Sequence, residues 1–239
     1  DALVADWVSV ASHRQNRTFM PPKNECPLCP AGHGSMPSEI PERDYQVVVF
    51  ENRFPSYAVT SVGADAPDPS GIFGTRPAVG RCEVVCFTSD HESSFKDLPV
   101  ERVRTVIDTW AQRTEALGAI PEVEQVFAFE NRGREIGVTL PHPHGQIYAY
   151  PYLPDRTKSL LEAARRYHER TGRLLGADIL AAEQADGSRV VVSGTHWTAY
   201  VPFAARWPLE VHLSPHRDVP DLVALDDEER DELAVIYRD

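Results

Sequence analysis

The segment PHPHGQIYAYP, residues 141–151, restricts the backbone more than any other part of the chain. Proline within a strand is confined to edges and bulges, and glycine there often marks a close approach of the backbone to another group. If the segment is extended, residues two apart share a face, so His142, His144 and Gln146 stand in one row. This pattern predicts a strand that presents imidazoles to a phosphate. The alternative is a pair of surface loop histidines.

Two cysteines, Cys26 and Cys29, lie in the proline-rich stretch PPKNECPLCPAGHG. The C-x-x-C spacing supplies one half of a tetrahedral zinc site. A redox motif, a disulfide and unrelated thiols are the alternatives. A redox C-x-x-C is expected at the start of a helix after a strand, whereas this pair lies among prolines and glycine. The spacing therefore favours zinc.

The other two zinc ligands must come from the remaining cysteines or from the nine histidines of the chain. Cys82 and Cys86 lie in the alternating run CEVVCF, where small buried thiols behave as apolar strand residues. We therefore favour His91, in the turn-like sequence SDHE, together with His142. The expected result is one structural zinc ion with all four positions closed to water.

Composition limits the classes of partner. The chain has 239 residues and can bury one large core or two small ones. Its formal net charge of −12 argues against a nucleic-acid surface, because phosphate binding requires clustered cations. No run of about 18 apolar residues exists, so no membrane span is expected. The cysteine content and the lack of a visible secretory signal indicate a reducing compartment, and we expect a cytoplasmic location.

Local patterns alternate between strands and helices. Residues rich in β-branched and aromatic types predict strands at 45–50, 57–62, 82–87, 126–130, 146–152, 189–193, 197–202 and 209–213. Helical spacing predicts a helix from Pro99 to Gly118, a long helical stretch from Asp155 to near Gly187, and a helix within 226–239.

Several motifs occur in a recognisable order. CPLC (26–29), FENRG (129–133), HPHGQ (142–146) and WPLE (207–210), with Trp7 and Val8 before them, resemble the galactose-1-phosphate uridylyltransferases of the histidine-triad superfamily. The resemblance implies an enzyme that exchanges UMP between UDP-glucose and galactose 1-phosphate by a ping-pong mechanism through a uridylylated histidine. It also implies zinc, UDP-sugar and hexose 1-phosphate substrates and a homodimer, without an organic cofactor.

The row of side chains at 142–146 has a chemical interpretation. His144 is the expected nucleophile, because a neutral imidazole, with an ordinary pKa of about 6.5, can attack phosphorus. Its second ring nitrogen is expected to donate to a backbone carbonyl, while zinc keeps His142 off the phosphate. Gln146 replaces the third histidine of the related hydrolases and has no titratable proton to deliver. A departing hexose 1-phosphate needs none, so the pattern favours nucleotidyl transfer over hydrolysis.

Two reasons identify candidate substrate-binding residues. An acidic protein that binds a nucleotide must concentrate positive charge locally, which suggests Arg14 and Arg17, and Arg132 beside Asn131. The resemblance adds residues for the base, the ribose and the phosphates. The expected substrate-binding residues are Arg14, Arg17, Phe50, Asn52, Asn131, Thr139 and Gln146. Two positions depart from the family. Arg53 stands where an acidic residue is usual. Leu160 stands where some relatives have a glutamate that binds a second metal, so no second metal site is expected.

Two segments, 83–98 and 210–225, both run from a strand through a turn histidine into an acidic helix start. They predict an α+β fold in which two histidine-triad-like repeats form a continuous, mainly antiparallel sheet with helices packed on it. Residues 1–186 are the expected catalytic half. Residues 187–239 are expected to begin a degenerate second half whose C-terminal part is absent.

Two other functions stay open. The chain could be an adenylyltransferase, or an ADP-sugar or dinucleotide phosphorylase of the same superfamily, because some enzymes that resemble this family use adenine. It could also be a non-catalytic, zinc-stabilised nucleotide-binding fragment in which the H-x-H pair is inert.

Overall fold

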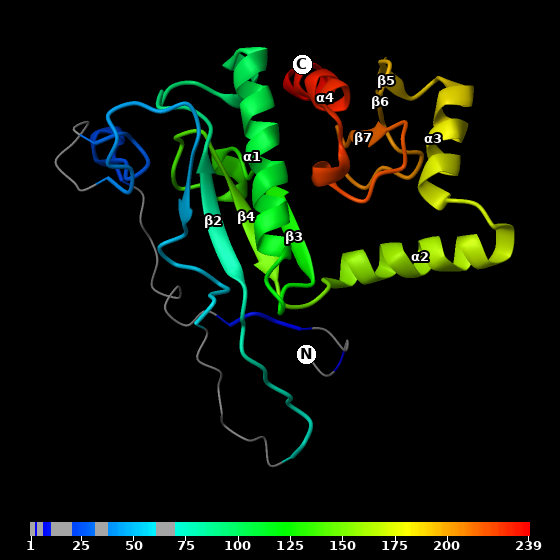
Figure 1. Cartoon of the computed structure of the whole chain (residues 1–239), viewed down its shortest axis with the longest axis horizontal. Helices are drawn as coiled ribbons and strands as arrows, with labels where there is room; N and C mark the ends of the chain where they lie inside the picture. Colours follow the sequence, from blue (N-terminus) through cyan, green and yellow to red (C-terminus); the bar gives the residue numbers. More distant parts are fainter. Residues whose placement is uncertain (1–2, 4–6, 11–20, 32–37, 61–69) are drawn as a thin grey trace. The chain divides into compact units, whose positions relative to one another are not determined.

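The computed structural model describes residues 3, 7–10, 21–31, 38–60 and 70–239 of the chain. The chain divides into two compact units, Asp1–Leu153 and Pro154–Asp239, which we call the first and the second unit. Figure 1 shows their helices and strands in chain order. Each unit contains its own antiparallel sheet.

The sheet of the first unit has the strand order β1-β2-β4-β3, and every neighbouring pair is antiparallel. Helix α1 lies along one face of this sheet (Figure 1). In chain order, the elements of the first unit are η2 (Lys23–Glu25), β1 (Val48–Glu51), β2 (Arg81–Cys86), η3 (Phe95–Asp97), α1 (Val100–Gly118), β3 (Gln125–Phe129), η4 (Arg134–Ile136) and β4 (His144–Tyr150).

The two faces of this sheet have different roles. On the face covered by α1, Glu83 of β2 accepts hydrogen bonds from two nitrogens of Arg113, each at 2.8 Å. Ile147 of β4 pairs with Glu83 and is fully buried. Because side chains alternate along a strand, Gln146 and its partner Val84 project from the opposite face. That opposite face carries the candidate site.

The second unit combines three strands with three α-helices. Its sheet has the order β5-β6-β7. Helix α4 packs against β6, where the indole nitrogen of Trp197 donates to the carbonyl of Glu229 at 2.8 Å. In chain order, the elements of the second unit are α2 (Asp155–Thr171), α3 (Leu175–Asp186), β5 (Val190–Ser193), β6 (Trp197–Tyr200), β7 (His212–Pro215), η5 (Leu222–Ala224) and α4 (Asp227–Arg238).

The strand predicted at 57–62 is wrong over its described part. Residues 57–60 form bends and a turn, and 61–62 lie outside the described residues. The buried Tyr57 packs its ring edge-on against Tyr148 and Tyr150 and bonds the hydroxyl of Tyr152 at 2.8 Å. The aromatic content that suggested a strand therefore serves packing on the sheet.

Two other elements differ from the predicted boundaries because of left-handed residues. The long helix predicted from Asp155 is divided into α2 and α3 at Gly172, whose φ is 71°. The strand predicted at 209–213 begins only at His212, because Leu209 has a φ of 64°, which a regular strand excludes.

The α+β class and the antiparallel pairing are confirmed. The described strands form one sheet in each unit. The compact units divide between Leu153 and Pro154, and the boundary between a catalytic and a degenerate half at 186 and 187 stays a prediction. Helices α2 and α3 belong to the second unit, where the hydroxyl of Tyr167 in α2 donates to Asp178 in α3 at 2.5 Å. A degenerate repeat within the chain stays a prediction.

Candidate active site and metal centre

Four side chains of the first unit form a cluster that is compatible with a metal site. The ligand atoms of Cys26, Cys29, His91 and His142 all lie within 4.8 Å of one another. Cys29 Sγ lies 3.2 Å from Nδ1 of His91 and 3.6 Å from Nδ1 of His142. Ligand atoms of a tetrahedral zinc ion lie roughly 3.5 Å apart, so these separations fit the bond lengths of such an ion. The structure thus brings together the four ligands named from the sequence.

A backbone carbonyl and a tyrosine hydroxyl fix the orientation of His142. Its Nε2 donates to the carbonyl of Thr88 at 2.8 Å, and the Tyr45 hydroxyl lies 2.9 Å from the same nitrogen. Nδ1 therefore carries the lone pair and faces the sulfur of Cys29. Burial lowers the pKa of His142 to about 4, so the ring is neutral near pH 7. A neutral imidazole held by its second nitrogen is the usual form of a metal ligand.

The two candidate sulfur ligands are buried with apolar neighbours. Cys26, Cys29 and Cys86 belong to one core cluster with Leu28 and Ile40. Burial raises the pKa of Cys29 to about 12, so this thiol keeps its proton unless a cation lies beside it. A divalent ion would supply that charge, and a closed set of two sulfurs and two imidazoles suits a structural ion.

His144 begins β4 directly after the metal cluster. Its Nδ1 donates to the carbonyl of His142 at 2.7 Å, which matches the hydrogen bond predicted for this ring. Nε2 consequently carries the lone pair of the ring. The same residue, His142, thus contributes its imidazole to the cluster and its carbonyl to the orientation of His144.

Gly145 has a packing reason for its place between these side chains. A Cβ atom at this position would lie 2.8 Å from Cζ of Phe87 and 2.9 Å from the carbonyl oxygen of Phe129. Both distances are shorter than normal contacts. Any larger residue would therefore push β4 away from its neighbours and displace His144.

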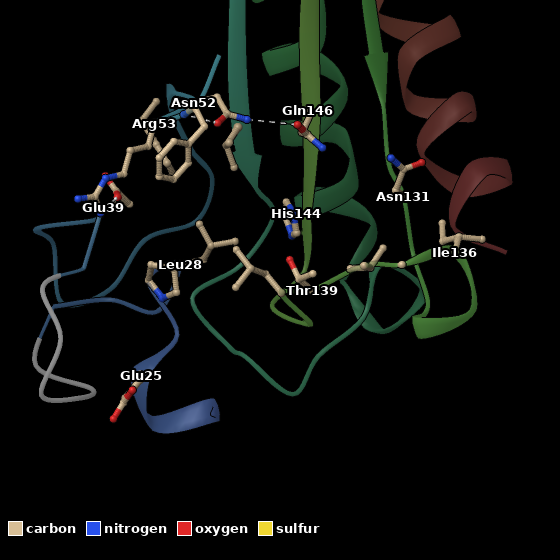
Figure 2. Close-up of a pocket in the computed structure, with 17 residues that line it drawn as sticks. Glu25, Leu28, Glu39, Asn52, Arg53, Asn131, Ile136, Thr139, His144 and Gln146 are labelled. Carbon is tan, nitrogen blue, oxygen red and sulfur yellow. Dashed lines mark hydrogen bonds and ion pairs between the residues drawn. The ribbon is translucent and has the colours of Figure 1, made fainter. Parts of the chain in front are cut away.

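The orientation of the Gln146 amide follows from a chain of hydrogen bonds. The backbone N–H of Phe54 donates to Oδ1 of Asn52 at 2.9 Å, which leaves Nδ2 of Asn52 to face the sheet. That nitrogen donates to Oε1 of Gln146 at 3.3 Å, and the hydroxyl of Tyr148 donates to the same oxygen at 3.4 Å. Nε2 of Gln146 is therefore turned away from Asn52, as Figure 2 shows. It offers N–H donors on the side of His144.

A cavity of about 360 Å³ lies over this face of the sheet, a volume within the range of small-molecule sites. Its polar lining residues are Glu25, Glu39, Asn52, Arg53, Asn131, Thr139, His144 and Gln146. Figure 2 shows His144 near the centre, with Thr139 beside it and Asn131 on the side away from Arg53. The apolar lining consists of Pro27, Leu28, Phe50, Phe54, Val84, Ile136, Val138 and Leu140.

Six of the residues named from the sequence line this one cavity: Phe50, Asn52, Asn131, Thr139, His144 and Gln146. Arg14 and Arg17 lie outside the described residues. Glu39 was not predicted from the sequence, and it lines the same cavity from a different loop. The only signal was the unusual Arg53, because Arg53 Nη1 lies 3.3 Å from Oε1 of Glu39.

A second cavity, of about 800 Å³, shares Asn131, Thr139 and His144 with the first. Its lining adds two cationic side chains, Lys23 and Arg132. The same lining contains Glu92 and Glu130, and Lys23 forms an ion pair with Glu92. The segment that carries His144 is thus accessible from two cavities.

Within the described residues, no helix has both the length and the apolar character needed to cross a membrane.

Comparisons with known proteins point to one family. Residues 1–154 match the family model described as galactose-1-phosphate uridyl transferase, N-terminal domain, and residues 160–239 match the C-terminal domain of the same family. A galactose-1-phosphate uridylyltransferase of Streptomyces lividans is 48% identical over 239 residues, which cover 99% of this chain and 61% of that protein. One of Thermotoga maritima is 38% identical over 240 residues, covering 99% of this chain and 71% of that protein.

Solved structures agree with this fold. A structure of a uridylyltransferase matches all of this chain and 72% of its own, with a TM-score of 0.86 and 29% identity. An ADP-glucose phosphorylase from Arabidopsis thaliana with bound ADP-glucose matches with a TM-score of 0.72 and 21% identity, covering all of this chain and 74% of its own. The second likeness shows a shared fold only. The chain spans 61% and 71% of the lengths of the Streptomyces and Thermotoga relatives.

Proposed function

The chain belongs to the galactose-1-phosphate uridyl transferase family, and on that premise we propose that it transfers UMP from UDP-glucose to galactose 1-phosphate through a uridylylated His144. The observation that carries the proposal is the hydrogen bond from Nδ1 of His144 to the carbonyl of His142, at 2.7 Å. It directs the lone pair to Nε2 on a ring that lines a cavity of nucleotide size.

The first half-reaction needs no proton transfer. The lone pair of His144 Nε2 attacks the α-phosphorus, an N–P bond forms, and the P–O bond to the β-phosphate breaks. Glucose 1-phosphate leaves with that electron pair. Positive charge develops on the imidazole, and the carbonyl of His142 stabilises it by accepting from Nδ1. In the second half-reaction, a phosphate oxygen of galactose 1-phosphate attacks the phosphorus and breaks the N–P bond.

Gln146 and Asn131 would hold the phosphoryl oxygens during transfer. Nε2 of Gln146 is directed away from Asn52 by the hydrogen bonds to its oxygen, so it presents donors to the phosphate. Because an amide has no titratable proton, it stabilises the transferring group without protonating the leaving group. Arg132, which lines the second cavity, would supply positive charge for the hexose phosphate.

The metal would be a structural zinc ion held by Cys26, Cys29, His91 and His142. When bound, it fixes the segment before β4 and takes no part in bond making. A cytoplasmic location agrees with four free cysteines. Homodimer formation and the substrate roles of Arg14 and Arg17 are further proposals that rest on family membership.

The proposed reaction can be tested by intact-protein mass spectrometry. After incubation with UDP-glucose, the protein should gain the mass of one UMP, and His144→Gly should gain none. An AMP adduct formed only with ADP-glucose would instead support the adenylyl alternative. If no nucleotide donor modifies the wild-type protein, the non-catalytic alternative holds.

A matched control separates loss of the nucleophile from loss of the fold. His168 is exposed on α2 of the second unit, and His168→Gly leaves the candidate site unaltered. The His168→Gly protein should therefore take up UMP at the wild-type rate. Subsequent addition of galactose 1-phosphate should remove the adduct and release UDP-galactose.

A further inference from the structure

An ion pair closes one side of the nucleotide cavity. Arg53 follows β1, and its Nη1 lies 3.3 Å from Oε1 of Glu39, which comes from a separate loop. Both residues line the cavity that also contains His144. Figure 2 shows their side chains pointing toward one another, on the side opposite to Asn131 and Ile136. The pair therefore lies away from the phosphate-binding end.

The loop that carries Glu39 is anchored to the metal-binding segment. The backbone N–H of Glu39 donates to the carbonyl of Pro27 at 2.9 Å, and the next residue, Ile40, is fully buried. The Glu39 side chain is 30% exposed, whereas that of Arg53 is 71% exposed. The carboxylate is thus held in the cavity wall, with the guanidinium on its solvent side.

A carboxylate in this position suits the hydroxyl groups of a ribose. In a nucleoside diphosphate sugar the ribose lies between the α-phosphate and the base. An ionised carboxylate has two oxygens that only accept, and carboxylates commonly accept from ribose hydroxyls in nucleotide sites. Arg53 contacts one of these oxygens, and each oxygen keeps further acceptor capacity for a hydroxyl.

The other cavity carboxylate, Glu25, is placed differently. It lies in η2 beside the metal-binding cysteines, and Figure 2 shows its side chain at a distance from Asn52 and Arg53 and directed away from them. Glu39 is therefore the carboxylate that shares a cavity wall with Asn52.

We propose that Glu39 accepts hydrogen bonds from the vicinal hydroxyls of the donor's ribose and that Arg53 is the positioning residue that orients its carboxylate. This inference rests on the proposed nucleotidyl transfer and specifies how the donor is selected. The uncommon arginine at 53 is then not a lost ribose contact. It holds an acid that reaches the same cavity from another loop.

The test compares a ribose with a deoxyribose donor. The rate of UMP attachment is measured with UDP-glucose and with its 2′,3′-dideoxy analogue, the deoxy donor, in the wild-type protein and in Glu39→Ala. Glu39→Ala should slow the reaction with UDP-glucose by roughly 10- to 100-fold, the effect of losing a hydrogen bond to a charged group. It should leave the rate with the deoxy donor unchanged.

Controls identify the cause of the loss. Glu42→Gln removes an exposed carboxylate from the same loop and should react like the wild type with both donors. Arg53→Leu should reduce the preference for the ribose donor, and Arg53→Lys should restore much of it. These variants give a second reading if Glu39→Ala does not fold.

The outcomes also separate this inference from the proposed function. If the wild type forms no adduct with either donor, the proposed function fails. If the wild type reacts but Glu39→Ala loses the same factor with both donors, the carboxylate acts elsewhere, for example on the base, and the inference is overturned. Retention of the full ribose preference in Arg53→Leu would contradict the role of Arg53.

Discussion

Backbone groups determine the orientation of the reactive side chains. The carbonyl of His142 holds Nδ1 of His144, and the N–H of Phe54 holds Oδ1 of Asn52. Asn52 in turn determines which end of the Gln146 amide faces the cavity. Such groups need no reorganisation when charge moves to the transferring phosphate, which is the main advantage of a preorganised site.

Replacement of Asn52 by aspartate tests this chain of hydrogen bonds. A carboxylate only accepts, so Gln146 would turn Nε2 toward Asp and present Oε1 to the phosphate. One transition-state donor would be lost, and we expect UMP attachment to slow by about 100-fold or more. The rate of adduct formation under single-turnover conditions measures this effect.

Tyr148→Phe is the matched control, because it removes the other donor to Oε1 of Gln146 without adding an acceptor. Its effect should be much smaller than that of Asn52→Asp. An Asn52→Asp protein that reacts at the wild-type rate would show that Asn52 does not orient Gln146.

At the residue scale, the sequence predicted side chains that are close in the chain better than those that are distant. The C-x-x-C and H-x-H spacings reveal two pairs directly. The contact between Asn52 and Gln146 spans β1, β2 and β4, and it depends on a register that no local pattern contains. Glu39 was missed for the same reason, because its partner Arg53 lies on another segment.

The short segment before β4 would connect the proposed metal site to the proposed nucleophile. His142 ends the metal cluster and His144 begins the strand, so the cluster and β4 share a backbone. Thr88 follows β2, and its carbonyl holds the His142 ring at 2.8 Å. Loss of the metal would therefore loosen the strand that presents His144.

Cys26→Ser should lower the zinc content and the melting temperature together, because metal binding is coupled to folding. Metal analysis and thermal unfolding measure the two quantities. Cys82→Ser is the matched control: Cys82 is also buried but lies outside the cluster. This variant should keep its zinc. A Cys26→Ser protein with one zinc per chain and unchanged stability would remove Cys26 from the site.

The predicted boundaries of helices and strands were wrong where tertiary packing or a left-handed backbone angle outweighed the local propensity of the residues. Tyr57 has a residue type typical of strands but fills an aromatic cluster with Tyr148 and Tyr150. The helix break at Gly172 was visible as a glycine, yet the helical spacing continues on both sides of it. The start of the long, strongly periodic helix α1 was predicted to within one residue.

At the scale of the whole molecule, the two units have separate sheets and separate polar anchors. The sequence predicted the α+β class from alternating patterns, but it does not contain the pairing of strand edges. In the second unit the buried Glu229 accepts from Nε of Arg217 at 2.8 Å and from the backbone of Asp226 at 3.0 Å. This network joins the start of α4 to the loop after β7.

The stability of the second unit should depend on the ionisation of Glu229. The hydrogen bonds from Arg217 lower the pKa of Glu229 to about 2, below its usual value of about 4.5. The contribution is therefore present above about pH 4.5 and is lost as the pH falls toward 2. Glu229→Gln should cost about 2–3 kcal/mol at pH 7 and progressively less below pH 4.

Urea unfolding at several pH values measures this difference. Glu228→Gln is the control, because the Glu228 side chain is 86% exposed and adjacent in α4. Its effect should be small at every pH. A cost of Glu229→Gln that does not change between pH 7 and pH 3 would contradict the assigned ionisation.

The most direct test of the central claim is the atom to which UMP becomes attached. Protein labelled with heavy nitrogen in its histidines can be treated with UDP-glucose and examined by NMR for coupling between phosphorus and nitrogen. The account predicts one adduct on His144, bonded through Nε2, because Nδ1 donates to the carbonyl of His142. Attachment through Nδ1, or to any residue other than His144, would contradict it.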